Sequence, residues 1–423
     1  MFKHGTCINK KWIDTPKSFQ TACTLATQIS LQVANGQYGG QTFTVSHLAP
    51  YVRVSYNKYL NKLKEQFPNA ALDEIVKAAN ELLHDEVKAG VQTIQFQENT
   101  FSSSNGQTPF VSIFMYLDED PEYKKETAMI IEEILKLRLL GMKNADGIYV
   151  TPAFPKLLFV LDEDNVPEDS EYHYLFKLAA KCSAVRANPD YISAKIMKEQ
   201  FDGCVFGCMG CRSFLSPWKD PYTGKYKFYG RFNRGVVSLN LPDIALSAKG
   251  DEDKFWCILD ERLELCKDAL LIKDKLVRRA HGYNSPIHWQ YGSIGRINPE
   301  DSIAQFCDNG YSSISLGYVG IYEATLAMMG VSHTNPKGKE FALRLIKHLE
   351  DKTIEWREIP GLHGCSLYGT PGESLTGKFE RCTRERFGVV PGITDKEYFT
   401  NSYHVNVKEE IDAFTKLSFE AEF

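Results

Sequence analysis

The composition of this chain is that of a large globular protein, and it excludes several function classes. Its 423 residues are 43% hydrophobic and 12% aromatic, which is enough to bury one large α/β core or two ordinary ones. The 54 acidic and 49 basic residues give a net charge of −5, which disfavours binding of a nucleic-acid polymer. No apolar run has the length of a membrane span and the first residues show no secretory signal, so we expect a cytoplasmic protein without membrane contact.

Hydrophobic spacing predicts helices and strands that alternate along the chain. In chain order the pattern predicts a helix at 22–33 ended by Gly36, Gly39 and Gly40, a helix over 72–83, a strand at 110–117, a helix through 130–135, strands at 157–161 and 236–241, a helix through 255–270, and a glycine-interrupted strand at 312–322. Such alternation favours an α/β fold. Because no internal repeat or polar linker is evident, we expect one domain spanning residues 1–423.

The segment between 201 and 218 concentrates cysteine and glycine. The chain has eleven cysteines, too few for a disulfide scaffold, and Cys204, Cys208 and Cys211 stand among three glycines in this short stretch. One interpretation is an iron–sulfur site, because thiolates at this spacing can share a cluster. A second is an ordinary turn with small packing residues. A third is a tight loop that presents one thiol for hydrogen-atom abstraction.

The segment Tyr368-Gly-Thr-Pro-Gly-Glu-Ser374 predicts a strand end followed by a helix. Thr370 could cap this helix, Pro371 suits its first position, and Gly372 would let a ligand approach. The N–H groups at the start of such a helix bind anions such as phosphates. The alternative is an ordinary capped helix with a glutamate, Glu373, in its first turn.

Several segments together resemble one enzyme family. They are Thr15-Pro-Lys-Ser18, Gln37-Tyr-Gly-Gly40, Met209-Gly-Cys-Arg-Ser-Phe-Leu215, Gly230-Arg-Phe-Asn-Arg-Gly-Val-Val-Ser-Leu-Asn-Leu-Pro242, Ser315-Leu-Gly-Tyr-Val-Gly-Ile-Tyr-Glu323, Leu367-Tyr-Gly-Thr-Pro-Gly-Glu-Ser374 and Thr400-Asn-Ser-Tyr-His-Val405. In this order they resemble the anaerobic, glycyl-radical (class III) ribonucleoside-triphosphate reductases over nearly the whole chain. The resemblance implies a ten-stranded α/β barrel of two antiparallel halves, with the loop 204–216 threaded into its centre as a finger loop.

The resemblance also implies a reaction. Cys211 would become the thiyl radical that removes the 3′ hydrogen of the ribose, after which the 2′ hydroxyl leaves as water and the 3′ hydrogen returns. Ser213 and Asn233 would hydrogen-bond ribose hydroxyls, although Asn233 could instead be a turn residue in its glycine-containing segment. The protein's share is to position the ribose and exclude water, while the radical supplies the chemistry.

Further site residues follow from the same resemblance. Tyr368 would orient the radical route, Glu373 would accept a ribose hydrogen bond, and Thr370, Gly372 and Ser374 would bind the substrate phosphates.

Two residues near the start are implied in regulation. Lys17 and Gln28 would lie in an early helix at a dimer interface that binds the specificity effectors, dNTPs and ATP, although a solvated lysine is an alternative for Lys17. His404 is more simply a structural histidine than a proton relay.

The expected partners and cofactors are those of the family. They are a ribonucleoside triphosphate substrate, a second copy of the chain in a homodimer, a glycyl radical made by an S-adenosylmethionine iron–sulfur activating enzyme, and formate as reductant. Met209 before Gly210-Cys211 favours formate over thioredoxin.

The chain also departs from the family pattern. It lacks the N-terminal ATP cone, the second catalytic cysteine, the paired Cys-x-x-Cys zinc site and the radical glycine, so we expect no metal site and an inactive fragment or split subunit. Two rivals remain. One is another glycyl-radical enzyme of the pyruvate formate-lyase type. The other is a catalytically silent nucleotide-binding fragment.

Overall fold

A computed structural model describes residues 1–37, 39–104, 106–210 and 213–423. It separates into two compact units, unit 1 (1–214 and 282–300) and unit 2 (215–281 and 301–423). The prediction of a single domain over 1–423 stays a prediction. None of the helices in the described ranges is long and apolar enough to cross a membrane.

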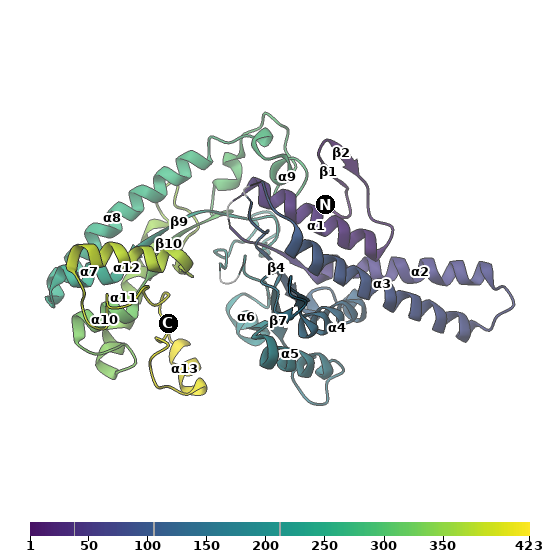
Figure 1. Cartoon of the computed structure of the whole chain (residues 1–423). Coiled ribbons are helices and arrows are strands. Elements are labelled where there is room, and N and C mark those ends of the chain that lie inside the picture. The colour runs from purple at the N-terminus through teal and green to yellow at the C-terminus, as the bar shows by residue number, and fades with distance from the viewer. Residues whose placement is uncertain (38, 105, 211–212) are drawn as a thin grey trace. The chain divides into compact units, whose positions relative to one another are not determined.

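Unit 1 is built on a four-stranded parallel sheet with helices connecting its strands (Figure 1). The sheet order is β3-β4-β7-β8, so neighbouring strands follow one another along the chain. The elements of unit 1 are β1 Thr6–Ile8, β2 Lys11–Ile13, α1 Phe19–Gly36, β3 Gln41–Thr44, α2 Ala49–Gln66, α3 Leu72–Thr100, β4 Val111–Met115, α4 Lys124–Leu140, β5 Met142–Lys143, β6 Tyr149–Val150, β7 Lys156–Leu161, α5 His173–Arg186, β8 Asp190–Ser193, α6 Ala194–Gln200 and α9 Pro286–Trp289.

Local sequence signals explain where α1 begins and ends. Ser18 is the N-cap, and its hydroxyl accepts a hydrogen bond from the Thr21 N–H at 3.2 Å. The buried residues Phe19, Ala22, Cys23 and Ala26 recur at helical spacing and join the hydrophobic core of unit 1. The helix ends at Gly36, as the glycine cluster predicts.

Unit 2 is built on a three-stranded parallel sheet in the order β11-β10-β9 (Figure 1). Its core lies between this sheet and the helices α7, α8, α10 and α11. The elements of unit 2 are β9 Asn233–Asn240, α7 Leu241–Ala248, α8 Glu252–Val277, β10 Ser313–Val319, α10 Ile321–Met329, α11 Pro336–Trp356, β11 Cys365–Gly369, α12 Glu373–Phe387 and α13 Ala413–Glu420.

The predicted α/β class is confirmed, and one predicted strand is too long. The pattern predicts a strand over 312–322, but β10 ends at Val319 and Tyr322 lies in α10. The reason is Gly320, whose φ of 86° is left-handed and turns the chain from strand into helix. The described residues hold seven parallel strands in these two sheets, and closure of a ten-stranded barrel stays a prediction.

Candidate active site

The cysteine-containing loop lies on the face of the unit 1 sheet that is opposite the helices. Along β4, Ile113 and Met115 point into the helical core. Successive side chains of a strand alternate between faces, so Ser112 and Phe114 point the other way. That face contacts the loop at Gly207, Cys208 and Gly210. The Ser112 hydroxyl donates a hydrogen bond to the Gly210 carbonyl of this loop, and the Phe114 ring fills the space beside Gly207.

Two hydroxyl groups on neighbouring strands hold the loop. Thr42 Oγ1 donates to the Cys208 carbonyl at 2.6 Å, and Ser112 Oγ donates to the Gly210 carbonyl at 2.7 Å. Thr42 and Ser112 are register partners in the β3–β4 ladder. The two anchors therefore lie side by side and fix alternate carbonyls of the loop.

The loop closes on itself next to these anchors. Met209 and Ser213 exchange two backbone hydrogen bonds, of 2.8 and 3.3 Å. Gly210 has a φ of 62°, which favours glycine, and a methyl group added at Gly40 would lie only 2.8 Å from the Gly210 Cα. The candidate radical residue Cys211, with its neighbour at 212, lies outside the described residues.

The chain after the loop is fixed in unit 2. Ser216 makes two hydrogen bonds with the buried Ser313. The Ser216 N–H donates to Ser313 Oγ at 2.7 Å, and the two hydroxyl oxygens are 2.8 Å apart. Arg231 donates to the carbonyls of Ser216, Gly310 and Tyr311. Burial lowers the pKa of Arg231 to about 10, so its guanidinium stays charged at neutral pH.

The face of the unit 2 sheet that is opposite the helices is lined by small polar residues. On the central strand β10, Ile314, Leu316 and Tyr318 belong to the core, so Ser315 and Gly317 point the other way. Gly317 leaves room there for a hydrogen bond of 3.1 Å between the hydroxyls of Ser238 and Thr370, because an added methyl group would overlap both.

Asn233 begins β9 on this sheet. Its Oδ1 accepts the Gly235 N–H at 2.8 Å and its Nδ2 donates to Ser315 Oγ at 2.8 Å. The contact with Gly235 is of the kind that asparagine makes in turns, whereas the contact with Ser315 joins β9 to β10, and the role of Asn233 at the ribose stays a prediction. Asn233 is level with Ser313, whereas Tyr368 is level with Gly317, so the two lie about 13 Å apart along the strands.

The turn after β11 differs from the sequence prediction in its capping. The helix α12 begins at Glu373, with Gly372 as N-cap, so Thr370 is not the cap and Pro371 precedes the helix. The reason is that the Thr370 hydroxyl is engaged with Ser238 across the sheet. Glu373 has a φ of 36°, uncommon for a residue other than glycine, and both Glu373 and Ser374 are exposed.

The missing cap is supplied by a residue that the sequence analysis did not single out. Asn401 Oδ1 accepts the Gly372 N–H at 2.7 Å. A methyl group at Gly372 would lie 2.8 Å from Thr376 and 3.3 Å from Asn401 Oδ1, so glycine is needed for this approach. Its place in the Thr-Asn-Ser-Tyr-His segment was the only sequence signal for Asn401.

The predicted effector residues lie in unit 1. Gln28 is an exposed residue of α1. Lys17 is also exposed, but it precedes the Ser18 N-cap and so lies outside the helix, which corrects its predicted place. In unit 2, His404 Nδ1 lies 3.2 Å from Glu420 Oε2, a contact that is an ion pair when the imidazole is protonated.

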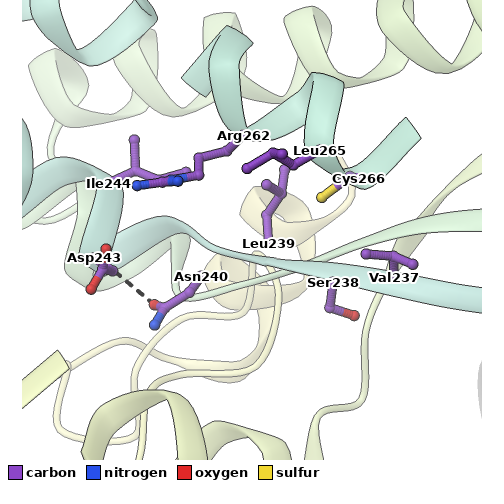
Figure 2. Close-up of a pocket in the computed structure, with 9 residues that line it drawn as sticks. All are labelled: Val237, Ser238, Leu239, Asn240, Asp243, Ile244, Arg262, Leu265 and Cys266. Atoms are coloured by element: carbon purple, nitrogen blue, oxygen red, sulfur yellow. Dashed lines mark hydrogen bonds between the residues drawn. The ribbon is translucent and has the colours of Figure 1, made fainter. Parts of the chain in front are cut away.

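A cavity of about 250 Å³ opens between β9, α7 and α8 in unit 2 (Figure 2). Val237, Leu239, Arg262, Leu265 and Cys266 are among its lining residues. None of the predicted site residues lines it, so we assign it no part in the active site. Among the described residues, no three His, Cys, Asp or Glu side chains gather as metal ligands.

Comparison with known proteins gives one consistent family. Residues 1–423 match the family model described as anaerobic ribonucleoside-triphosphate reductase. The chain is 37% identical to the Escherichia coli enzyme of that name and 38% identical to that of Enterobacteria phage T4, each aligned over the whole chain. It covers 58% and 68% of these relatives, so it spans a little over half the length of the bacterial protein.

Solved structures show the same fold. A Thermotoga maritima anaerobic ribonucleotide reductase with dATP bound in the specificity site is 14% identical, with a TM-score of 0.68 over 98% of this chain and 66% of that one. A structure of the Thermotoga maritima enzyme in complex with dATP and CTP gives a TM-score of 0.66, at 13% identity, over all of this chain and 65% of that one.

Proposed function

Since the chain belongs to the anaerobic ribonucleoside-triphosphate reductase family, we propose that its gene product reduces ribonucleoside triphosphates to 2′-deoxyribonucleoside triphosphates, with Cys211 as the radical residue. The observation that carries the proposal is the anchored loop. Thr42 and Ser112 fix the carbonyls of Cys208 and Gly210, and Cys211 follows Gly210 directly in the sequence.

The radical on Cys211 would come from a glycyl radical, which an S-adenosylmethionine iron–sulfur activating enzyme generates. The chain's own residues would position the substrate and exclude water. The Cys211 sulfur would take the 3′ hydrogen and later return it. An S–H bond and a ribose C–H bond are similar in strength, so this transfer would be readily reversible.

We propose formate as the reductant. One ribonucleoside triphosphate and one formic acid would then give one deoxyribonucleoside triphosphate, one carbon dioxide and one water. The 2′ hydroxyl leaves as the water, and the two electrons come from the formate carbon.

The substrate phosphates are assigned to the start of α12. Gly372 N–H is taken by Asn401, and the following N–H groups, of Glu373 and Ser374, have no recorded partner among the described residues. A helix N-terminus carries a partial positive charge that favours phosphate. Thr370, Tyr368 and Asn233 then border the ribose from the polar face of the unit 2 sheet.

Regulation and assembly follow the family expectation. We propose a homodimer in which the region of Lys17 and Gln28 binds dNTP or ATP effectors. The fold match to a relative with dATP in its specificity site supports a nucleotide effector.

The test is anaerobic turnover of the full-length gene product with its activating enzyme and formate. Wild-type protein should convert CTP to dCTP, whereas Cys211→Ser should form the glycyl radical but no product. The proposal fails if wild-type protein with a confirmed glycyl radical makes no deoxyribonucleotide. Nucleotide binding without turnover would favour the silent binding fragment instead.

A further inference from the structure

The segment Thr400–Ser402 lies against the turn between β11 and α12. Asn401 Oδ1 accepts the Gly372 N–H at 2.7 Å. A methyl group placed at Gly369 would lie 3.5 Å from Ser402 Oγ, so this side chain faces the first residue of the turn. Two consecutive residues of one segment therefore contact the two ends of the turn.

The segment is itself held rigidly by α10. Glu323 is fully buried, and its Oε1 accepts the N–H and the hydroxyl of Thr400 at 2.9 and 2.8 Å. The Gly320 N–H donates to the Thr400 carbonyl, and the Ile321 N–H donates to the Ser402 carbonyl. Lys396 pairs with the same oxygen of Glu323, which balances its charge. The position of Asn401 is thus fixed by groups on both sides of it.

Ser402 has an unfavourable side-chain environment and backbone conformation in this structure. Its side chain is 1% exposed, and its hydroxyl has no hydrogen-bond partner among the described residues. Its φ of 43° lies in the left-handed region, which serine rarely adopts. Strained backbone angles cluster at active sites and ligand clamps, and an unpaired buried hydroxyl is rare enough to call for a reason.

The charge of residue 401 is informative. Aspartate caps a helix N-terminus as well as asparagine does, and its negative charge would interact favourably with the helix dipole. Helix stability alone therefore gives no reason for a neutral amide next to Gly372. A neutral acceptor is required if the same helix start must receive an anion.

We propose that Asn401 and Ser402 are positioning residues of the triphosphate site, an inference that rests on the proposed function. Asn401 takes the Gly372 N–H, so that the N–H groups of Glu373 and Ser374 are left to face a phosphate together. Ser402 holds a buried hydroxyl against Gly369, and this hydroxyl gains its hydrogen-bond partner from the turn when the triphosphate draws the turn into place.

The first test is Asn401→Asp in the full-length gene product, because this change keeps the cap and adds only a charge. We expect the KM for CTP to rise about tenfold with a smaller change in kcat, since a like charge opposes the phosphate. The inhibition constant of inorganic triphosphate should rise by a similar factor, and inhibition by cytidine should not change. The melting temperature should be that of the wild type.

Asn335→Asp is the matched control. Asn335 is the N-cap of α11 in the same unit, and its side chain accepts the Lys337 N–H. The same substitution there should leave the KM for CTP and the triphosphate inhibition unchanged.

Ser402→Ala is the second test, and it decides the matter if Asn401→Asp does not fold. Removal of an unpaired hydroxyl should leave the melting temperature unchanged or raise it, whereas the KM for CTP should rise about fivefold. Wild-type KM values in either folded variant would overturn the inference. A wild-type protein that makes no dCTP would instead refute the proposed function itself.

Discussion

The hydroxyl groups of Thr42 and Ser112 hold the part of the loop that precedes Cys211. Ser112 is fully buried, and its hydroxyl donates to the Gly210 carbonyl at 2.7 Å, a carbonyl that also accepts the Cys208 thiol at 3.5 Å. Ser112→Ala should cost about 1 kcal/mol of unfolding free energy, because a buried carbonyl loses its hydroxyl donor and keeps the weaker thiol contact. Turnover should fall at least about tenfold, since a small displacement of a reacting group is costly.

Urea unfolding and dCTP formation measure the two effects of Ser112→Ala. Ser183→Ala is a suitable control, because it removes a hydroxyl contact of 2.7 Å to Tyr191 between α5 and β8. The control should keep wild-type turnover. Equal turnover in wild type and Ser112→Ala would show that the anchor does not matter to catalysis.

The close contact of Gly40 with Gly210 makes a second prediction for one residue. An alanine at Gly40 would place its methyl group 2.8 Å from the Gly210 Cα, which is backbone and must move. Gly40→Ala should therefore lower dCTP formation more than it lowers the melting temperature. Gly377 lies within α12, where alanine favours a helix more than glycine does, and the atom nearest to an added methyl group is the Glu397 carbonyl oxygen at 3.3 Å, so Gly377→Ala should keep wild-type dCTP formation.

At the level of elements, the packing of α1 against α3 encloses a carboxyl group. Glu98 on α3 is fully buried, and its Oε1 accepts the Ser30 hydroxyl at 2.5 Å. Burial raises the pKa of Glu98 from 4.5 to about 8. Between these values the folded protein holds a proton that the unfolded chain has lost, so stability falls as pH rises from about 4.5 to 8.

Glu98→Gln should remove this pH dependence. The variant should match the wild type near pH 5 and exceed its unfolding free energy by at least about 1 kcal/mol at pH 8.5. Urea unfolding at the two pH values measures the difference. A wild-type stability that does not decline from pH 5 to 8.5 relative to the variant would contradict the buried, protonated state.

Elements with strong local signals were predictable, and contacts between them were not. The helical pattern at 22–33 predicts the middle of α1, and the apolar run at 157–161 predicts β7. The pairing of Thr42 with Ser112 depends on the register of two strands far apart in the sequence, which no local pattern reports. A serine within an otherwise apolar buried strand was the one signal that could have indicated Ser112.

The cap of α12 shows the same limit. Thr370 has the right residue type and approximate position for an N-cap. Sheet formation instead brings Ser238 next to the Thr370 hydroxyl. Asn401, far downstream in the sequence, accepts the Gly372 N–H in place of Thr370. A local propensity was overridden by tertiary contacts.

For the whole molecule, family membership came from dispersed segments in a fixed order. No single segment was enough to indicate the family, whereas the order of the segments along the chain was. The α/β class and the two parallel sheets agree with the fold of the solved relatives.

The most direct test of the account is anaerobic turnover of CTP deuterated at the 3′ carbon. The account predicts slower dCTP formation than with unlabelled CTP, deuterium retained at the 3′ carbon of the product, and no product from Cys211→Ser in the presence of a glycyl radical. Product formation by Cys211→Ser at the wild-type rate would contradict it.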